Sequence, residues 1–92
     1  MSIERVSIQS DYVLEGILRK SDRKAGVVIC HPHPLYGGDM YNNVVEAIDE
    51  GFTRKRFTTL RFNFRGVGGS KGTYDDGEGE ATDLLSALKT LR

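Results

Sequence analysis

The stretch that decides the fold is AGVVICHPHPLYGGD, residues 25–39. Its first six residues form an unbroken apolar run, which predicts a strand buried on both faces, as in the centre of a parallel sheet. Its remaining residues, HPHPLYGGD, contain two prolines and two glycines, which exclude regular structure and predict a loop. An irregular loop is therefore expected directly at the carboxyl end of a strand.

A helix and another strand are expected after this loop. From about Met40 the apolar residues recur at helical spacing, at Tyr41, Val44, Val45, Ile48 and Phe52. Asp39 or Asn43 is the expected N-cap, and the helix should end near Gly51 or within residues 54–56. Residues 57–64, FTTLRFNF, alternate between apolar and polar side chains and predict a strand.

The last third of the chain reads as a Gly-rich loop, residues 65–79, followed by a helix. Asp75 or Asp76 is its expected cap, and acidic residues in the first turn suit the helix dipole. The predicted apolar stripe consists of Ala81, Leu84, Leu85, Leu88 and Leu91.

The first 20 residues predict a β-hairpin. Val6 and Ile8 alternate with polar residues, and residues 12–18, YVLEGIL, form a second β-rich run after the polar residues 9–11. The whole order is a β-hairpin followed by βαβα, which predicts an α/β fold with a mostly parallel sheet and flanking helices. In such sheets ligands bind at the carboxyl ends of the strands, where the two loops should meet.

The composition limits the classes of protein to which this chain can belong. A chain of 92 residues is one small domain or part of one, and residues 1–92 are expected to belong to a single domain. Thirteen basic and thirteen acidic residues cancel, so no global charge favours nucleic acid or a membrane surface. The single cysteine, Cys30, cannot form an internal disulfide, and the sequence shows neither a signal-peptide pattern nor a membrane-spanning apolar run. A cytoplasmic protein is therefore expected.

Four hypotheses compete for HPHPLYGG. A metal site would use His31, His33 and Asp39, but two imidazoles two residues apart on a loop are a weak signal. A Cys30–His31 nucleophile pair is disfavoured because Cys30 ends an apolar strand, where thiols are usually inert packing groups. The loop could simply be a rigid turn. It could also be an oxyanion-type loop, whose backbone amides at Leu35 and Tyr36 point at a developing negative charge.

The second loop, RGVGGSKG, is open to similar alternatives. Gly66, Gly68 and Gly72 resemble a dinucleotide fingerprint, but that motif requires a helix to open within it, and here the helix begins too late. A phosphate-binding P-loop is excluded because no GK[ST] follows at the required spacing. Arg65 and Ser70 are expected to hold the loop together or to line a cleft. Ser70 as a nucleophile would need His31 or His33 as its base.

Together, VVICHPHPLYGGDMYNNVV and LRFNFRGVGGSKGTYDDGEGE resemble a bacterial branch of the α/β-hydrolase superfamily, and the resemblance covers essentially the whole chain. It implies a mostly parallel eight-stranded sheet, of which these strands are the first four. It also implies a serine hydrolase acting on esters or related acyl compounds, without a cofactor. HPHPLYGG would supply an oxyanion amide from Leu35 or Tyr36. His31, His33, Arg65 and Ser70 would line the cleft.

The family's nucleophile is absent from the sequence. It belongs to G-x-S-x-G on a sharp turn between the fifth strand and a helix. Residues 68–72, GGSKG, match those letters only, because the preceding strand should end at Phe64 and no helix should follow directly. The resemblance thus implies an N-terminal portion without the triad, inactive alone. The alternative is a noncatalytic remnant, a binding module or a split-hydrolase subunit. The strand at residues 27–30 would then be a sheet edge, which predicts self-association or a complementing polypeptide.

Overall fold

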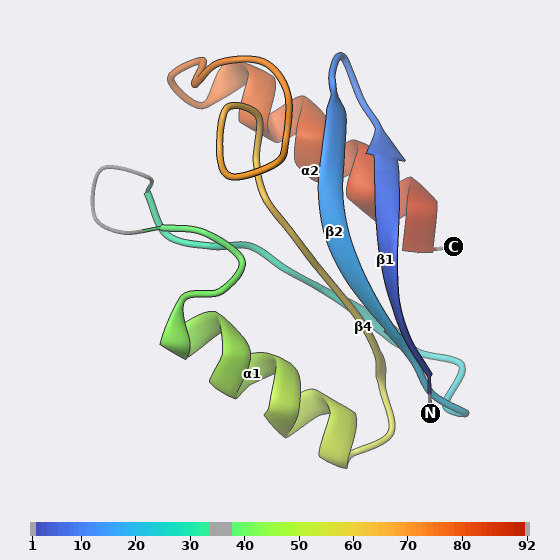
Figure 1. Cartoon of the computed structure of the whole chain (residues 1–92). Coiled ribbons are helices and arrows are strands. Elements are labelled where there is room, and N and C mark those ends of the chain that lie inside the picture. The colour runs from blue at the N-terminus through green and yellow to red at the C-terminus, as the bar shows by residue number, and fades with distance from the viewer. Residues whose placement is uncertain (1, 34–37, 92) are drawn as a thin grey trace.

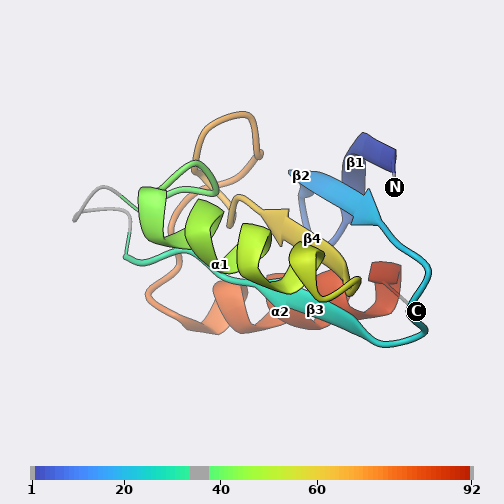
Figure 2. The ribbon, with the colours of Figure 1, turned by 90° about the horizontal axis from the view of Figure 1, so that it is seen from below.

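A four-stranded mixed sheet with one helix on each face makes up the fold, as Figure 1 and Figure 2 show. It is seen in a computed structural model that describes residues 2–33 and 38–91. The strand order is β1-β2-β4-β3, with β3 parallel to β4 and the other pairs antiparallel. The predicted α/β class, with a hairpin followed by βαβα, is confirmed. In chain order the elements are β1 (Ser2–Gln9), β2 (Val13–Lys20), β3 (Gly26–Ile29), α1 (Asn43–Arg54), β4 (Thr58–Phe62) and α2 (Glu78–Leu91).

The two faces of the sheet differ in polarity because the side chains of β4 alternate between apolar and polar. Leu60 and Phe62 point toward α2, where they form a fully apolar core with Ile8, Leu14 and Ala87. Thr59 and Arg61 occupy the other face, beneath α1. The apolar/polar alternation of residues 57–64 therefore separates a hydrophobic layer from a buried polar layer.

The predicted apolar stripe of α1 is only partly correct. The residues that α1 buries are Val45, Asp49 and Thr53, whereas Val44 and Ile48 are exposed. The cause is Asp49, which is fully buried and accepts a hydrogen bond from Thr59 Oγ1 at 2.5 Å. Its other carboxylate oxygen, Oδ2, lies 3.2 Å from Arg61 Nε. A buried charged cluster thus sets the rotation of the helix and leaves part of its apolar surface facing outward. The N-cap was also mispredicted, because it is Asn42, whose side chain accepts the Val44 and Val45 N–H groups.

The stripe of α2 is shifted in the same way. Its buried residues are Gly79, Asp83 and Ala87, while Leu85 and Leu88 are exposed. The helix begins at Glu78, after the predicted caps, and the Glu80 carboxylate accepts the N–H groups of Asp75 and Gly77.

The strand at the start of the decisive stretch lies at the edge of the sheet. Val27 and Val28 of β3 are half-buried, and only Ile29 is buried. Cys30 is exposed, so the expectation of an inert thiol packed in a buried strand is wrong. The reason is that, among the described residues, β3 has a neighbouring strand on one side only.

Replacing Arg56 by Gly is expected to stabilise the fold by about 0.5–1 kcal/mol, because Arg56, the residue after the C-cap of α1, has a left-handed φ of 67°. Its ion pair with Asp22 is exposed and contributes little. The neighbouring Lys55 has an ordinary φ of −91°, so Lys55→Gly is the matched control and should destabilise. Urea denaturation of both variants would contradict this account if Arg56→Gly were the less stable one.

Candidate functional site

The segments that follow β3 and β4 meet at the carboxyl end of the parallel pair, as the sequence predicts. His31 joins them directly. Its Nε2 accepts the backbone N–H of Phe64 at 3.1 Å, so the ring proton is on Nδ1, which donates to the Pro32 carbonyl at 2.7 Å. Both ring nitrogens of this buried histidine are therefore engaged with the backbone. His31 therefore holds the ends of the two strands together.

His33 is the exposed histidine of the pair. Its Nε2 lies 3.0 Å from the hydroxyl of Tyr74, which in turn donates to Asp76 Oδ1 at 3.3 Å. This connects the loop after β3 to the approach to α2. Among the described residues, a hollow of about 250 Å³ is lined by His31, Pro32, His33, Phe64, Tyr74, Gly77 and Glu80. That this hollow is a substrate cleft stays a prediction.

Ser70 lies elsewhere, in a buried network that joins the second loop to β2 and to the end of β4. Its hydroxyl donates to the Asn63 carbonyl at 2.6 Å and accepts the Glu15 N–H at 3.0 Å. Glu15 also accepts from Asn63 Nδ2 and from the Gly69 N–H. Gly68 has a left-handed φ of 53°, and a Cβ there would lie 2.5 Å from Asn63 Nδ2, so a side chain at this position would be strained and would displace the network. Through these contacts Ser70 holds the second loop in place.

Ser70→Ala is therefore expected to destabilise the fold by about 1–3 kcal/mol, because it leaves the Glu15 N–H without its acceptor. Ser86→Ala is the matched control. The Ser86 hydroxyl bonds back to the Thr82 carbonyl within α2, so its loss should be neutral or slightly stabilising. Equal stabilities of the two variants in urea denaturation would contradict the structural role of Ser70.

Arg65 is buried and holds α2 against the hairpin. Its guanidinium donates to both carboxylate oxygens of Asp83, at 2.9 and 3.1 Å, and to Asp11 at 3.0 Å. Asp83 also accepts from the Arg65 N–H and from the Ser10 hydroxyl. The hydrogen bonds to Asp83 raise the pKa of Arg65. Arg65 and Ser70 do not line the hollow beside the histidines, and their cleft-lining role stays a prediction.

Acid is expected to weaken this contact. Burial by itself would raise the pKa of Asp83, but the hydrogen bonds and charge of Arg65 outweigh burial and hold the pKa below its ordinary value of 3.8. The unfolded chain therefore takes up the proton at a higher pH than the folded chain. The stability that Asp83 contributes is complete above about pH 4 and is lost as the pH falls through the lower, folded-state pKa. Urea denaturation through that range should show a steeper loss in the parent than in Asp83→Asn, and equal losses would contradict the assignment.

Sequence reasoning missed the residues that organise this region: Glu15, Asn63 and Asp83. Asn63 is buried at the end of β4, where its Oδ1 accepts the Met40 N–H at 2.7 Å. One signal was available for Asp83, which falls at helical spacing between Gly79 and Ala87. A carboxylate in such a row, with Arg65 on the preceding loop, indicates a buried pair. The predicted oxyanion residues Leu35 and Tyr36 lie outside the described residues.

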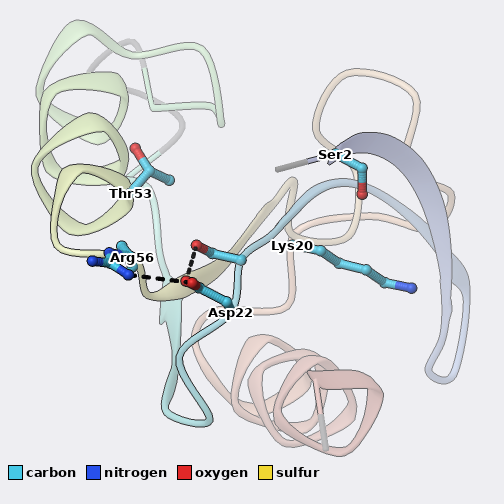
Figure 3. A pocket seen from close by; sticks show the side chains of 6 residues that line it. Ser2, Lys20, Asp22, Thr53 and Arg56 are labelled. Atoms are coloured by element: carbon cyan, nitrogen blue, oxygen red, sulfur yellow. Dashed lines mark hydrogen bonds and ion pairs between the residues drawn. The ribbon is translucent and has the colours of Figure 1, made fainter.

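A larger hollow, of about 680 Å³, lies at the opposite end of the sheet. Figure 3 shows Ser2, Lys20, Asp22, Thr53 and Arg56 around it, with Asp22 contacting Arg56. These residues stand near the amino ends of β3 and β4, away from the edge where ligands of parallel sheets bind. This hollow is therefore not a candidate for the functional site.

The part of the chain that the structure describes contains no group of three or more His, Cys, Asp or Glu side chains able to hold a metal ion. Within the same residues, no helix is long and apolar enough to cross a membrane.

No protein-family model matches this chain. An uncharacterized protein of Rickettsia prowazekii is 48% identical over 65 residues, which are 71% of this chain and 27% of that protein.

Solved structures match almost the whole chain. A serine hydrolase homologue of α/β type from Coxiella burnetii is 40% identical with a TM-score of 0.92, over 99% of this chain and 46% of that one. A protein of unknown function from Agrobacterium tumefaciens, suggested to be an α/β hydrolase, is 42% identical with a TM-score of 0.90, over 96% and 42%. A lidless serine hydrolase from Xanthomonas campestris is 28% identical with a TM-score of 0.90, over 100% and 45%. This chain therefore has part of an α/β-hydrolase fold, and it spans less than half the length of each of these structures.

Proposed function

We propose that the chain is the oxyanion-loop portion of a serine hydrolase that acts on esters or related acyl compounds. The observation that carries this proposal is the 40% identity, at a TM-score of 0.92 over 99% of the chain, to the C. burnetii serine hydrolase homologue. In this proposal a backbone amide of Leu35 or Tyr36 stabilises the tetrahedral oxyanion. No cofactor takes part, and a cytoplasmic location stays a prediction.

The proposal assigns no nucleophile to the 92 residues. Ser70 is buried, and its hydroxyl is engaged with two backbone groups. His31 has both ring nitrogens engaged, so it offers no base. A small independent enzyme built on Ser70 and His31 is therefore disfavoured. The 92-residue chain should bind or hydrolyse esters only when the rest of a hydrolase fold is supplied.

A chimera tests this function. Residues 1–92 replace the matched stretch of the C. burnetii protein, and the remainder of that protein is kept. We expect the chimera to hydrolyse a short p-nitrophenyl ester and to react with a fluorophosphonate probe, whereas the 92-residue chain alone does neither. A folded chimera that is inert to both reagents would contradict the proposal.

A second candidate is a noncatalytic binding module or a split-hydrolase subunit. The hollow beside His31 and His33 favours it, because it is present without any assigned nucleophile. The binding module predicts saturable binding of an ester without turnover, even in the chimera.

A further inference from the structure

The loop between β3 and α1 is closed at its base by its own backbone. The Gly38 N–H donates to the His33 carbonyl at 3.2 Å. A Cβ at Gly38 would collide with the Pro32 carbonyl, so a side chain there would force the base apart. Two residues further on, the Met40 N–H donates to the side chain of Asn63, just after β4, at 2.7 Å. His33 and Gly38 therefore form a narrow base, and the Gly38 side of this base is anchored to the sheet.

The His33 side of the base is held by Tyr74, which comes from the approach to α2. The Tyr74 hydroxyl lies 3.0 Å from His33 Nε2, and the two rings meet edge to face with their centroids 5.0 Å apart. The hydroxyl donates to Asp76 Oδ1 at 3.3 Å, so it accepts from His33, whose Nε2 carries a proton in this arrangement. These contacts connect the start of the first loop to the end of the second.

Tyr74 itself comes from a firmly held segment. The Glu80 carboxylate, in the first turn of α2, accepts the N–H groups of Asp75 and Gly77 at 2.9 and 3.0 Å. On the other side, a Cβ at Gly66 would lie 3.0 Å from the Tyr74 backbone nitrogen, so the backbone at Tyr74 packs directly on the start of the second loop. The segment that carries Tyr74 is thus supported both by α2 and by the loop that follows β4.

We propose that Tyr74 is a positioning residue, which fixes the His33 end of the loop that carries the oxyanion amides. This inference rests on the proposed function, because Leu35 and Tyr36, the candidates for that amide, follow His33 in the sequence. A catalytic group must be held within about 0.5 Å of its productive position, and a misplacement of about 1 Å can lower the rate 10²-fold. Asn63 holds one end of the loop, and Tyr74 holds the other by acting through His33.

Hydrogen exchange of the Gly38 amide in the 92-residue chain, followed by NMR, tests the positioning without reference to activity. Tyr74→Phe keeps the ring contact with His33 and removes the hydroxyl. The Gly38 amide should then exchange about five- to tenfold faster, while the amides of β4 keep the rates of the parent. Tyr12→Phe is the matched control and should change neither, because Tyr12 contacts the Arg65 guanidinium through its ring. Unchanged Gly38 exchange in Tyr74→Phe, or equal acceleration of the β4 amides, would overturn the proposal.

Steady-state kinetics of the chimera supply a second readout. Tyr74→Phe should lower kcat for the p-nitrophenyl ester about tenfold and leave KM nearly unchanged. Asp76→Gly should also lower kcat, because it removes the acceptor of the Tyr74 hydroxyl, and glycine suits the left-handed φ of 53° at this position. Asp76→Asn keeps an acceptor oxygen and should lower kcat less than Asp76→Gly does.

The two readouts separate this inference from the proposed function. A higher KM at constant kcat in Tyr74→Phe would overturn the positioning role, because Tyr74 would then contact the substrate. An equal loss of kcat in Tyr12→Phe would overturn it as well. A folded chimera that is inert in every form would contradict the proposed function alone, and the exchange of the Gly38 amide would still decide whether Tyr74 holds the loop.

Discussion

Asp83→Ala is expected to cost about 3–5 kcal/mol of folding free energy, which is a large part of the stability of a small domain. The substitution leaves the Arg65 guanidinium, only 5% exposed, without its bidentate partner. It also removes the acceptor of the Ser10 hydroxyl and of the Arg65 N–H. Since these groups join α2, the loop after β4 and the β1–β2 turn, the loss should loosen all three. Urea denaturation measures the change.

The matched control is Glu50→Ala, which removes an ion pair from the surface of α1. Glu50 and Arg54 are 2.7 Å apart, but both side chains are more than half exposed. Pairs of this kind contribute about 0.3–0.5 kcal/mol. If the two substitutions cost the same, the buried Arg65–Asp83 pair does not hold the fold together.

Tyr36→Pro in the chimera is expected to lower kcat about 10²–10³-fold, because proline removes the backbone N–H proposed for the oxyanion hole. Tyr36→Phe is the matched control, since it keeps the amide and changes only the side chain. Leu35→Pro and Leu35→Ile form the second pair and decide which of the two amides acts. The measurement is steady-state kinetics with a short p-nitrophenyl ester, in which KM should change much less than kcat.

Equal loss of kcat in Tyr36→Phe and Tyr36→Pro would assign the effect to the side chain or to the folding of the loop. No loss in either proline variant would remove both amides from the oxyanion hole, while leaving the hydrolase activity of the chimera itself intact.

The order of the helices and strands could be predicted from the sequence, because the features that specify this order are local. The alternation of residues 57–64 correctly predicts which of Thr59, Leu60, Arg61 and Phe62 share a face. The prolines and glycines of HPHPLYGG correctly separate β3 from α1. Both signals act within a few residues, and the tertiary structure does not override them.

The rotation of the two helices could not be predicted from the apolar pattern. Asp49 and Asp83 are both fully buried. Each lies at the centre of the buried side of its helix, where the apolar pattern predicts an apolar residue. Their partners, Arg61 and Arg65, come from other elements, so the pairing exists only in three dimensions. The same holds for Ser70, which matches the motif G-x-S-x-G in its letters only. In the structure its hydroxyl hydrogen-bonds to the backbone of Asn63 and Glu15 and holds the loop in place.

Intact-mass and peptide analysis of the chimera after treatment with a fluorophosphonate probe tests the central claim most directly. If residues 1–92 supply the oxyanion loop and no nucleophile, the chimera gains one adduct, on a serine of the C. burnetii portion, and the 92-residue chain gains none. An adduct on Ser70, in the chimera or in the chain alone, would contradict the account.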